Sequence, residues 1–529
     1  MKKALLLAVI ALTLFGCKTP IQAPDNPKPA TENGGAGDND PQPQHVVVSD
    51  QWKALLPETY GINTQTANGP SWSDQLFMTR LAGLSLGNMR YPGGTIGNYW
   101  DWKTGAIKAV DDKDPAKGPT KGNMSSNNIY RPEELDNGVI ASGAMPIFMV
   151  NMLTSNLSYQ MEMLASAAGM GLPIKYVELG NEFYLSYTQG GDATYKDPAT
   201  GLYDKYGDYA NVPYHYATAK QYADTCEYYI SEIHKLYPDA KIAFQGVVDD
   251  PTAAYFKNSP RTVNWNADMK RYITSTKYLT IHDYPNIDDY PNHGTRTPAG
   301  ALKITLDQYK ADMAFVAATY PGYKVWFTEY NNKTDSNNGG FRRNLYAGMW
   351  IHGIISSLST AYLMTSPQVE ITCIHDIASG ITSGLVFAGD TKITVAWNDA
   401  SQVTGKNLEY TASGVAHSLL GRVALGAESV QPLSVTSNPV ISTEKGNIES
   451  LQGALFKQGD ATRMFVVNAS DKATTLGIAN LTGISTVETA TAASPTSFIL
   501  SSADYNIDKK IRFADKTVDL PPWSITIIY

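Results

Sequence analysis

The stretch YVELGNE, residues 176–182, is a short apolar run that ends abruptly in Gly-Asn-Glu. A strand that stops there leaves an amide and a carboxyl group, those of Asn181 and Glu182, at its carboxyl end. A second apolar run, KVWFTEY at residues 324–330, delivers Glu329 near its own end. In a (β/α) barrel the carboxyl ends of the strands carry the chemistry. Two carboxylates delivered there satisfy the requirement for cleaving a glycosidic bond with an acid/base and a nucleophile.

The two runs belong to a longer series of strand candidates. Apolar runs lie near residues 60, 89, 148, 177, 243, 280, 327 and 372, and helical patterns separate most of them. Runs that are apolar throughout, rather than alternating, are typical of parallel strands covered on both faces. The series therefore predicts an α/β fold class with a closed (β/α)8 TIM barrel over residues 45–428. Helices are expected at 158–170, 216–236, 301–319, 341–358 and 411–424.

The pattern changes after about residue 430. Short alternating runs appear at 453–457, 464–468, 511–513 and 524–528, and turn residues separate them. This spacing predicts a C-terminal antiparallel β-sandwich over residues 429–529. The run at 45–50 is a candidate for one more strand of that sandwich.

The amino-terminal sequence is typical of a bacterial export signal. Residues 1–16 combine two early lysines with an apolar run, and LFGC at 14–17 resembles the lipobox of bacterial lipoproteins. That resemblance implies lipidation of Cys17 and anchoring in the cell envelope, on either face of the outer membrane. An ordinary secretory signal is the alternative. Residues 17–44 are rich in Pro, Gly, Asn and Asp, which predicts a disordered tether.

Composition excludes several classes of function. The 529 residues carry a net charge of −8, which argues against a nucleic-acid partner. The 3 cysteines have no zinc-ligand spacing, so Cys226 and Cys373 are either inert thiols or a disulfide. The 32 tyrosines and 9 tryptophans supply rings that can fill a core or stack on sugars.

Several motifs match one group of enzymes. LGNE at 179–182 resembles the Asn-Glu signature that ends the fourth barrel strand in retaining glycoside hydrolases of clan A, and TEY at 328–330 resembles the segment with the glutamate of the seventh. RYPGG at 90–94 is similar to a segment of the α-L-arabinofuranosidase family and, more loosely, of heparanase-like β-glucuronidases. YGIN at 60–63 and HDY at 282–284 fit the same group. The resemblance implies a polysaccharide or oligosaccharide substrate and no cofactor.

The resemblance also implies roles for individual residues. Glu182 would be the general acid/base, Glu329 the nucleophile, and Asn181 a ligand of the substrate 2-hydroxyl. Carboxyl groups about 5–5.5 Å apart give a covalent glycosyl-enzyme and retained configuration. Glu329 must be charged, so it needs donors or a cation, and Arg90 and Tyr284 are the candidates.

Three further groups near these strand ends have competing interpretations. Strand alternation places Glu178 inside the barrel, where we expect a structural ion pair with Arg90 or another base. His282 and His375 could form a metal pair with the aspartates that follow them. Strand-end histidines more often hydrogen-bond a sugar or a carboxylate, so His282 is expected to bind substrate and no metal is expected.

Aromatic residues follow the same strand ends. Trp100, Trp102, Tyr184 and Tyr187 are candidates for sugar platforms, and packing within loops is the alternative. The tyrosine-rich stretch 184–216 is expected to wall a cleft, because a loop this long inside a barrel is usually functional. Residues 331–340 are expected to form a rim beside the nucleophile.

Two questions stay open at the level of sequence. The chain could be a non-catalytic glycan-binding surface lipoprotein on a degenerate barrel, although both strand-end glutamates are present. The substrate is also undecided, since Arg90–Gly94 favours arabinofuranosidase-like or glucuronidase-like enzymes whereas the tyrosine loop favours an endo-glucanase. A uronic acid would need an additional cation, for which Arg342 and Arg343 are available.

Overall fold

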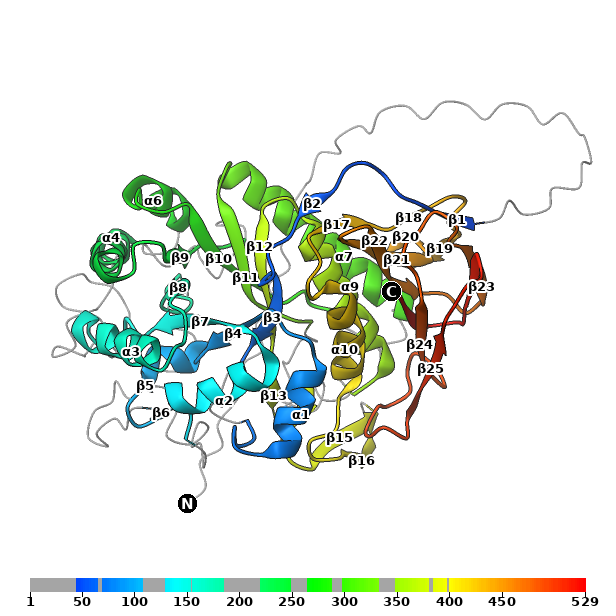
Figure 1. Ribbon diagram of the computed structural model, residues 1–529, viewed down its shortest axis with the longest axis horizontal. Coiled ribbons are helices and arrows are strands. Elements are labelled where there is room, and N and C mark those ends of the chain that lie inside the picture. Colours follow the sequence, from blue (N-terminus) through cyan, green and yellow to red (C-terminus); the bar gives the residue numbers. More distant parts are fainter. Residues whose placement is uncertain are drawn as a thin grey trace, which may run out of the picture. The chain divides into compact units, whose positions relative to one another are not determined.

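The computed structural model describes ten stretches of the chain: residues 44–64, 69–107, 129–153, 155–184, 219–248, 264–287, 297–332, 348–379, 384–396 and 399–529. They contain a closed barrel of parallel strands and, after it, antiparallel sheets (Figure 1). The predicted α/β fold class is therefore confirmed. None of the helices in these stretches is long and apolar enough to cross a membrane. Cys17 and the tether lie outside the described residues.

Eight strands form the barrel, and each contains one of the predicted apolar runs. In order around the ring they are β3 (Tyr60–Asn63), β4 (Asn88–Tyr91), β7 (Met145–Val150), β8 (Tyr176–Leu179), β9 (Lys241–Gln245), β10 (Tyr278–Asp283), β11 (Lys324–Tyr330) and β12 (Val369–His375). Parallel pairing of β12 with β3 closes the ring. A separate buried cluster that includes Trp326, Tyr176 and Cys373 comes from these strands. Cys373 and Cys226 are both buried free thiols, not a disulfide.

Helices lie outside the ring of strands (Figure 1). They are α1 (Gln75–Gly83), α2 (Pro132–Ser142), α3 (Leu157–Gly169), α4 (Ala219–Leu236), α6 (Trp265–Tyr272), α7 (Pro298–Thr319), α9 (Trp350–Thr365) and α10 (Ala412–Ala424). Side chains cap several of them; Asp74, for example, accepts from two backbone N–H groups at the start of α1. Helix α9 continues beyond the predicted end at 358, because apolar residues extend to Met364. It ends at Thr365, since Ser366 precedes a proline, which disfavours helical conformation.

In the described residues, the C-terminal domain contains two large sheets, besides the two-stranded pairing of residues 440–443 with 446–449. The larger has seven strands, in spatial order β2 (Lys53–Ala54), β17 (Ser429–Pro432), β21 (Leu451–Gln458), β22 (Ala461–Asn468), β27 (Ser524–Ile528), β24 (Thr486–Ala492) and β25 (Tyr505–Ile511). The smaller has four, β18 (Ser434–Val435), β1 (Gln44–Val47), β23 (Thr474–Gly477) and β26 (Thr517–Leu520). One apolar cluster, which includes Val46, Leu455 and Leu476, joins the two sheets. Strand β1 pairs with β18 and β23, so the first described residues are part of this domain.

The central strands β22 and β27 of the seven-stranded sheet are buried on both faces. Along β22, Met464 and Val466 contact the four-stranded sheet's cluster, whereas Phe465 and Val467 belong to the main core shared with α9 and α10. This is why β22 reads as a continuous apolar run although its neighbours are antiparallel. The indole N–H of Trp350, the first residue of α9, donates to the carbonyl of Trp523 at 2.7 Å. The sheet is thus a layer of the same core as the barrel's outer helices.

Short elements complete the described chain. They are the 3₁₀ helix η2 (Thr95–Tyr99) and the strands β5 (Trp100–Asp101), β6 (Ala106–Ile107), β13 (Ala378–Ser379), β14 (Val386–Phe387), β15 (Thr391–Ala396), β16 (Asp399–Gly405), β19 (Val440–Thr443) and β20 (Gly446–Glu449). Of these, η2 follows β4 directly and places its residues at the carboxyl end of the barrel strands.

The contact between the seven-stranded sheet and the helices can be tested by a substitution that removes one buried methylene group. Ile527 is fully buried in the main core, so Ile527→Val should lower the free energy of unfolding by about 0.5–1.5 kcal/mol. The matched control is Ile511→Val, because Ile511 is 68% exposed and should change stability by less than about 0.5 kcal/mol. Urea unfolding of both variants measures the difference. Equal values would contradict the placement of Ile527.

Candidate active site

The two predicted glutamates meet at the carboxyl end of the barrel. Glu329 is the penultimate residue of β11, and Glu182 follows β8 after a sharp turn. In that turn Gly180 has φ +74° and Glu182 has φ +50°, and a Cβ on Gly180 would lie 2.1 Å from the Phe183 ring. Carboxylate oxygens of Glu182 and Glu329 lie within 4.8 Å of each other, with a ring nitrogen of His282 at the same range. The structure thus brings the two acids face to face.

Glu329 is buried and held on both oxygens. Its Oε1 accepts from the Tyr284 hydroxyl at 2.6 Å, and its Oε2 accepts from Arg90 Nη1 at 3.0 Å. Burial alone would raise the pKa of Glu329. The positive charge that His375 and His282 can carry, the Arg90 guanidinium and the Tyr284 hydrogen bond together lower this pKa instead. The contacts with Arg90 and Tyr284 are those that the sequence predicted for a charged Glu329.

Arg90 connects the carboxylates beneath the site. It is fully buried and binds Glu178 through Nε at 2.6 Å and Nη2 at 2.8 Å, while Nη2 also donates to Asn181 Oδ1 at 2.8 Å. Burial would raise the pKa of Glu178, but the charge of Arg90 lowers it. The expected structural pair of Glu178 and Arg90 is therefore present. Asn181, whose side chain is oriented by Arg90, lies beside it.

His282 lies between carboxylates. Its Nδ1 is 3.0 Å from Glu182 Oε1, and its Nε2 is 3.0 Å from Thr328 Oγ1 and 3.7 Å from Glu178. Burial lowers the pKa of this imidazole, but Glu329, Glu178 and Glu182 outweigh that effect and raise it to about 9. His282 is thus a cation at neutral pH that binds the protein's own acids.

This raised pKa has a consequence for stability. A histidine that binds protons more tightly when folded stabilises the protein fully below about pH 6.5, and the contribution is lost as pH rises through about 9. The stability gap between wild type and His282→Asn should therefore shrink by about 3 kcal/mol between about pH 6 and pH 10. Urea unfolding at several pH values measures this gap. A stability gap between wild type and His282→Asn that stays constant with pH would contradict the assignment.

Two residues that the sequence did not single out hold the site together. Asn98, in η2, donates from Nδ2 to the Asn181 carbonyl at 2.8 Å and accepts from the Asn181 N–H at 3.1 Å. Asn63, which ends β3, donates from Nδ2 to Glu329 Oε2 at 3.3 Å. Asn63 could have been found, because it is a polar residue at the end of an apolar strand like Asn181. Gly93, with φ +73°, makes room for it: a Cβ there would lie 1.8 Å from Asn63 Oδ1.

The candidate sugar platforms behave differently from one another. Trp100 is 3% exposed, its indole N–H donates to the Tyr91 hydroxyl at 3.1 Å, and its ring packs near Tyr130. Packing within the core, the alternative to a platform, therefore describes Trp100. Tyr184 is also buried, but its hydroxyl donates to Glu182 Oε1 at 3.4 Å, which places it at the site. Tyr187, the rest of the tyrosine-rich loop, residues 333–340 of the rim, and Arg342 and Arg343 lie outside the described residues.

The donors at the site do not form a convincing metal centre. Glu182, His282 and Glu329 are close enough together to surround an ion. However, Arg90 Nη1 lies 3.0 Å from Glu329 Oε2, so a positive charge already balances this carboxylate. This arrangement is suited to holding and moving protons.

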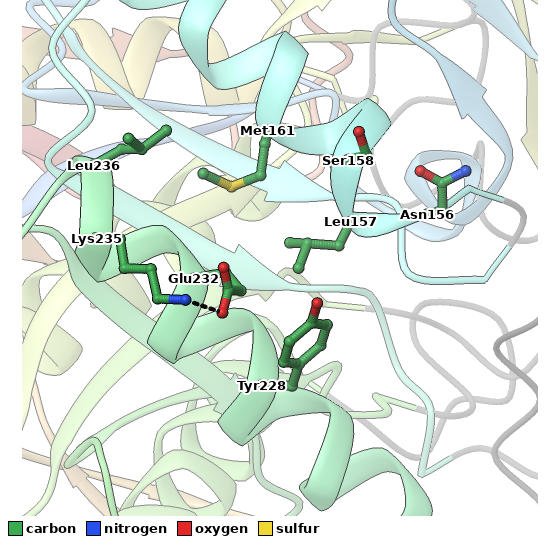
Figure 2. A pocket seen from close by; sticks show the side chains of 8 residues that line it. All are labelled: Asn156, Leu157, Ser158, Met161, Tyr228, Glu232, Lys235 and Leu236. Atoms are coloured by element: carbon green, nitrogen blue, oxygen red, sulfur yellow. Dashed lines mark hydrogen bonds and ion pairs between the residues drawn. The ribbon is translucent and has the colours of Figure 1, made fainter.

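A surface groove of about 690 Å³ lies elsewhere, between α3 and α4. Figure 2 shows its lining, in which Leu157 of α3 faces the exposed Tyr228 of α4, and Glu232 pairs with Lys235. No residue of the carboxylate cluster lines it. The groove belongs to the outer helices, and the candidate site remains the carboxyl end of the barrel.

Comparisons with known proteins identify solved structures with a similar fold. No protein-family model and no curated protein sequence matches the chain. Among solved structures, the GH51 α-L-arabinofuranosidase from Thermotoga petrophila RKU-1 matches with a TM-score of 0.59 at 16% identity, over 92% of this chain and 98% of that one. The fold is shared with glycoside hydrolases.

Two other matches have different named activities. A 4-O-α-L-rhamnosyl-β-D-glucuronidase from Fusarium oxysporum 12S matches with a TM-score of 0.55 at 13% identity, over 92% of this chain and 98% of that one. A family 44 endoglucanase from Clostridium thermocellum matches with a TM-score of 0.52 at 14% identity, over 92% and 99%. At these identities the matches establish the barrel with its C-terminal antiparallel sheet domain.

Proposed function

We propose that this chain is a retaining O-glycosyl hydrolase that cleaves an external polysaccharide or oligosaccharide by double displacement. The separation of Glu182 and Glu329 carries this proposal. Their carboxylate oxygens lie within 4.8 Å of each other, near the roughly 5–5.5 Å typical of retaining enzymes and below the roughly 6.5–9.5 Å that leaves room for water in inverting ones. At such a separation, retaining enzymes hold one anomeric carbon between the two carboxyl groups.

Glu329 is suited to be the nucleophile because its surroundings keep it ionised. Hydrogen bonds from Tyr284 and Arg90 orient both oxygens of the carboxylate. In the first step one oxygen attacks the anomeric carbon, the bond to the leaving oxygen breaks, and a glycosyl ester forms. The negative charge of Glu329 is then lost, and water later restores it by releasing the sugar.

Glu182 is suited to be the acid/base. Its side chain is 15% exposed, more than that of Glu329, so a leaving group and then a water can reach it. It protonates the leaving oxygen in the first step and takes a proton from water in the second. When Glu182 gives up its proton, the carboxylate that forms lies 3.0 Å from the His282 imidazole, which stabilises it.

Asn181 is suited to bind the substrate 2-hydroxyl. Its Oδ1 accepts from Arg90 Nη2, and this contact fixes which way the amide points. The Nδ2 group is therefore on the side away from Arg90, as a donor to a sugar hydroxyl must be. Bonds to the 2-hydroxyl strengthen at the oxocarbenium-like transition state.

α-L-Arabinofuranosides are the first substrates that we propose. The RYPGG segment resembles arabinofuranosidases, and the T. petrophila arabinofuranosidase shares the fold. An endo-acting glucanase is the second candidate, supported by the fold match to the family 44 endoglucanase. A polysaccharide panel with product sizing separates them: arabinose released from chain ends supports the first, and oligosaccharides of glucose support the second.

The acid/base assignment predicts a dependence on the leaving group. Glu182→Gln should lower kcat on an unactivated arabino-oligosaccharide by about 10²–10⁴-fold, because the leaving alkoxide then receives no proton. The loss should be much smaller on 4-nitrophenyl α-L-arabinofuranoside, since nitrophenolate leaves without one. The anomeric configuration of the first product, followed by NMR, gives a direct check. An inverted product would contradict double displacement.

Attachment to the cell envelope through Cys17 remains a proposal from the sequence alone. Labelling of expressing cells with a palmitate analogue tests it. Label incorporated by the wild type and lost in Cys17→Ser supports a lipid anchor, whereas equal labelling contradicts it.

A further inference from the structure

A chain of polar side chains runs behind Glu329 from two neighbouring strands. Asn63, at the end of β3, has its Nδ2 atom 3.3 Å from Glu329 Oε2 and 2.8 Å from His375 Nδ1. His375 ends β12, which pairs with β3 and places the two residues directly opposite each other. Asn63 is fully buried, so its amide contacts are not exchanged with bulk water.

The orientation of the Asn63 amide follows from its neighbours. A carboxylate can only accept hydrogen bonds, so the amide must turn an N–H toward Glu329. The opposite orientation would place Oδ1 where Nδ2 now lies, 3.3 Å from Oε2, and two acceptors would repel each other. The second N–H of the same Nδ2 group then points to His375 Nδ1, which must be the accepting nitrogen.

This orientation sets the tautomer of His375. With Nδ1 as acceptor, the ring proton is on Nε2, which faces Asp376 Oδ2 at 3.7 Å. The Tyr284 ring packs edge-on against the imidazole, with 5.8 Å between the two ring centroids. The His375 carbonyl accepts a hydrogen bond from Asn331 Nδ2. His375 Nδ1 is 3.8 Å from Glu329 Oε1, too far for a hydrogen bond. The hydrogen-bonded route from His375 to Glu329 therefore passes through Asn63.

We propose that His375 is a positioning residue for Glu329: it accepts from the Asn63 amide and so keeps that amide donating to the carboxylate. This rests on the proposed function, in which Glu329 is the nucleophile. His375 itself does not touch the reacting atoms. Without it, the second Asn63 N–H loses its acceptor, the amide is released to rotate, and Glu329 Oε2 loses a donor.

The loss of that donor should be visible in the titration of Glu329. Fewer hydrogen bonds to the charged form raise a carboxyl pKa, so the acidic limb of the pH–activity profile should move to higher pH. The other titratable or charged groups that face this carboxylate come from β4, β8, β10, β12 and the residues after them: Arg90, Glu178, Glu182, His282, Tyr284 and Asp376. All of these side chains are still present in a His375 variant. A shift in the Glu329 pKa therefore reports on the Asn63 contact and on the loss of the imidazole itself.

Carboxyl ¹³C NMR of protein labelled at glutamate Cδ measures the Glu329 titration without any substrate. The Glu329 signal is assigned as the one missing from Glu329→Gln. His375→Ala should raise its midpoint by about one pH unit and lower kcat on 4-nitrophenyl α-L-arabinofuranoside by about 10- to 100-fold, with little change in KM. His375→Gln, whose amide oxygen can accept from Asn63, should restore most of the wild-type Glu329 midpoint and most of the wild-type kcat. His234→Ala on α4 is the matched control and should change neither.

Asn63→Ala separates positioning from direct electrostatics. If His375 acts through Asn63, the double variant that combines His375→Ala with Asn63→Ala should have the same Glu329 titration midpoint as Asn63→Ala alone. Additive shifts, or an unchanged midpoint in His375→Ala, would overturn the proposal. This failure is distinct from failure of the proposed function, which would appear as turnover retained by Glu329→Gln. If His375→Ala does not fold, the Gln variant and Asn63→Ala still decide the matter, because a midpoint unmoved by Asn63→Ala excludes the route.

Discussion

Glu329→Gln is expected to lower kcat by on the order of 10⁵- to 10⁶-fold, the scale of losing a covalent nucleophile. The amide keeps the shape of the side chain but cannot attack the anomeric carbon. It also removes the charge that raises the pKa of His282, so that imidazole should titrate at lower pH in the variant. Initial rates on 4-nitrophenyl α-L-arabinofuranoside and on the polysaccharide panel measure the loss.

The control for this substitution is a glutamate outside the site. The Glu162 side chain, on α3, is 53% exposed and pairs with Lys103, so Glu162→Gln should leave kcat unchanged. Circular dichroism of both variants should match the wild type. A Glu329→Gln protein that turns over substrate at the wild-type rate would remove Glu329 from the mechanism.

Arg90→Met is expected to lower the free energy of unfolding by about 3–5 kcal/mol, the cost of breaking a buried ion pair by removing one partner. Arg90 and Glu178 are both fully buried, and Arg90 also binds Glu329. The variant leaves these carboxylates without their cation, so both should take up protons at higher pH. Unfolding in urea at neutral pH measures the loss, which should become smaller in acid.

Arg271→Met on α6 is the matched control, since Arg271 is exposed and its loss should change stability by less than about 0.5 kcal/mol. Adding Glu178→Gln to Arg90→Met should restore part of the stability, because the uncompensated charge is then gone. An Arg90→Met protein as stable as the wild type would contradict the assignment of a buried, charge-balanced cluster.

The meeting of Glu182 with Glu329 could be predicted because it depends on topology alone. In a closed parallel barrel every strand ends on the same rim, so acids that end two strands share that rim. Apolar periodicity located all eight strands, and one residue type per strand end was then enough to place the site. The pairing of Arg90 with Glu178 followed in the same way, since alternation put Glu178 inside the barrel.

The fate of individual side chains could not be predicted in this way. Trp100 and Tyr184 both follow strand ends, yet η2 turns Trp100 into the core while Tyr184 reaches Glu182. Asn63 resembles any polar residue at a strand end until the neighbouring strand supplies its partner, His375. Strand β2, only two residues long, is too short for any periodicity to reveal. These features depend on contacts across the chain, which a linear pattern does not contain.

The position of β1 has a consequence for how the protein is made. Residues 44–47 lie between β18 and β23, which are contributed by residues 434–435 and 474–477. An emerging polypeptide therefore carries β1 without either of its strand partners until residues 434–435 and 474–477 have been synthesised. The smaller sheet can therefore form only after the barrel residues have been synthesised, and a gene shortened at the end of the barrel would yield a product in which β1 lacks both strand partners.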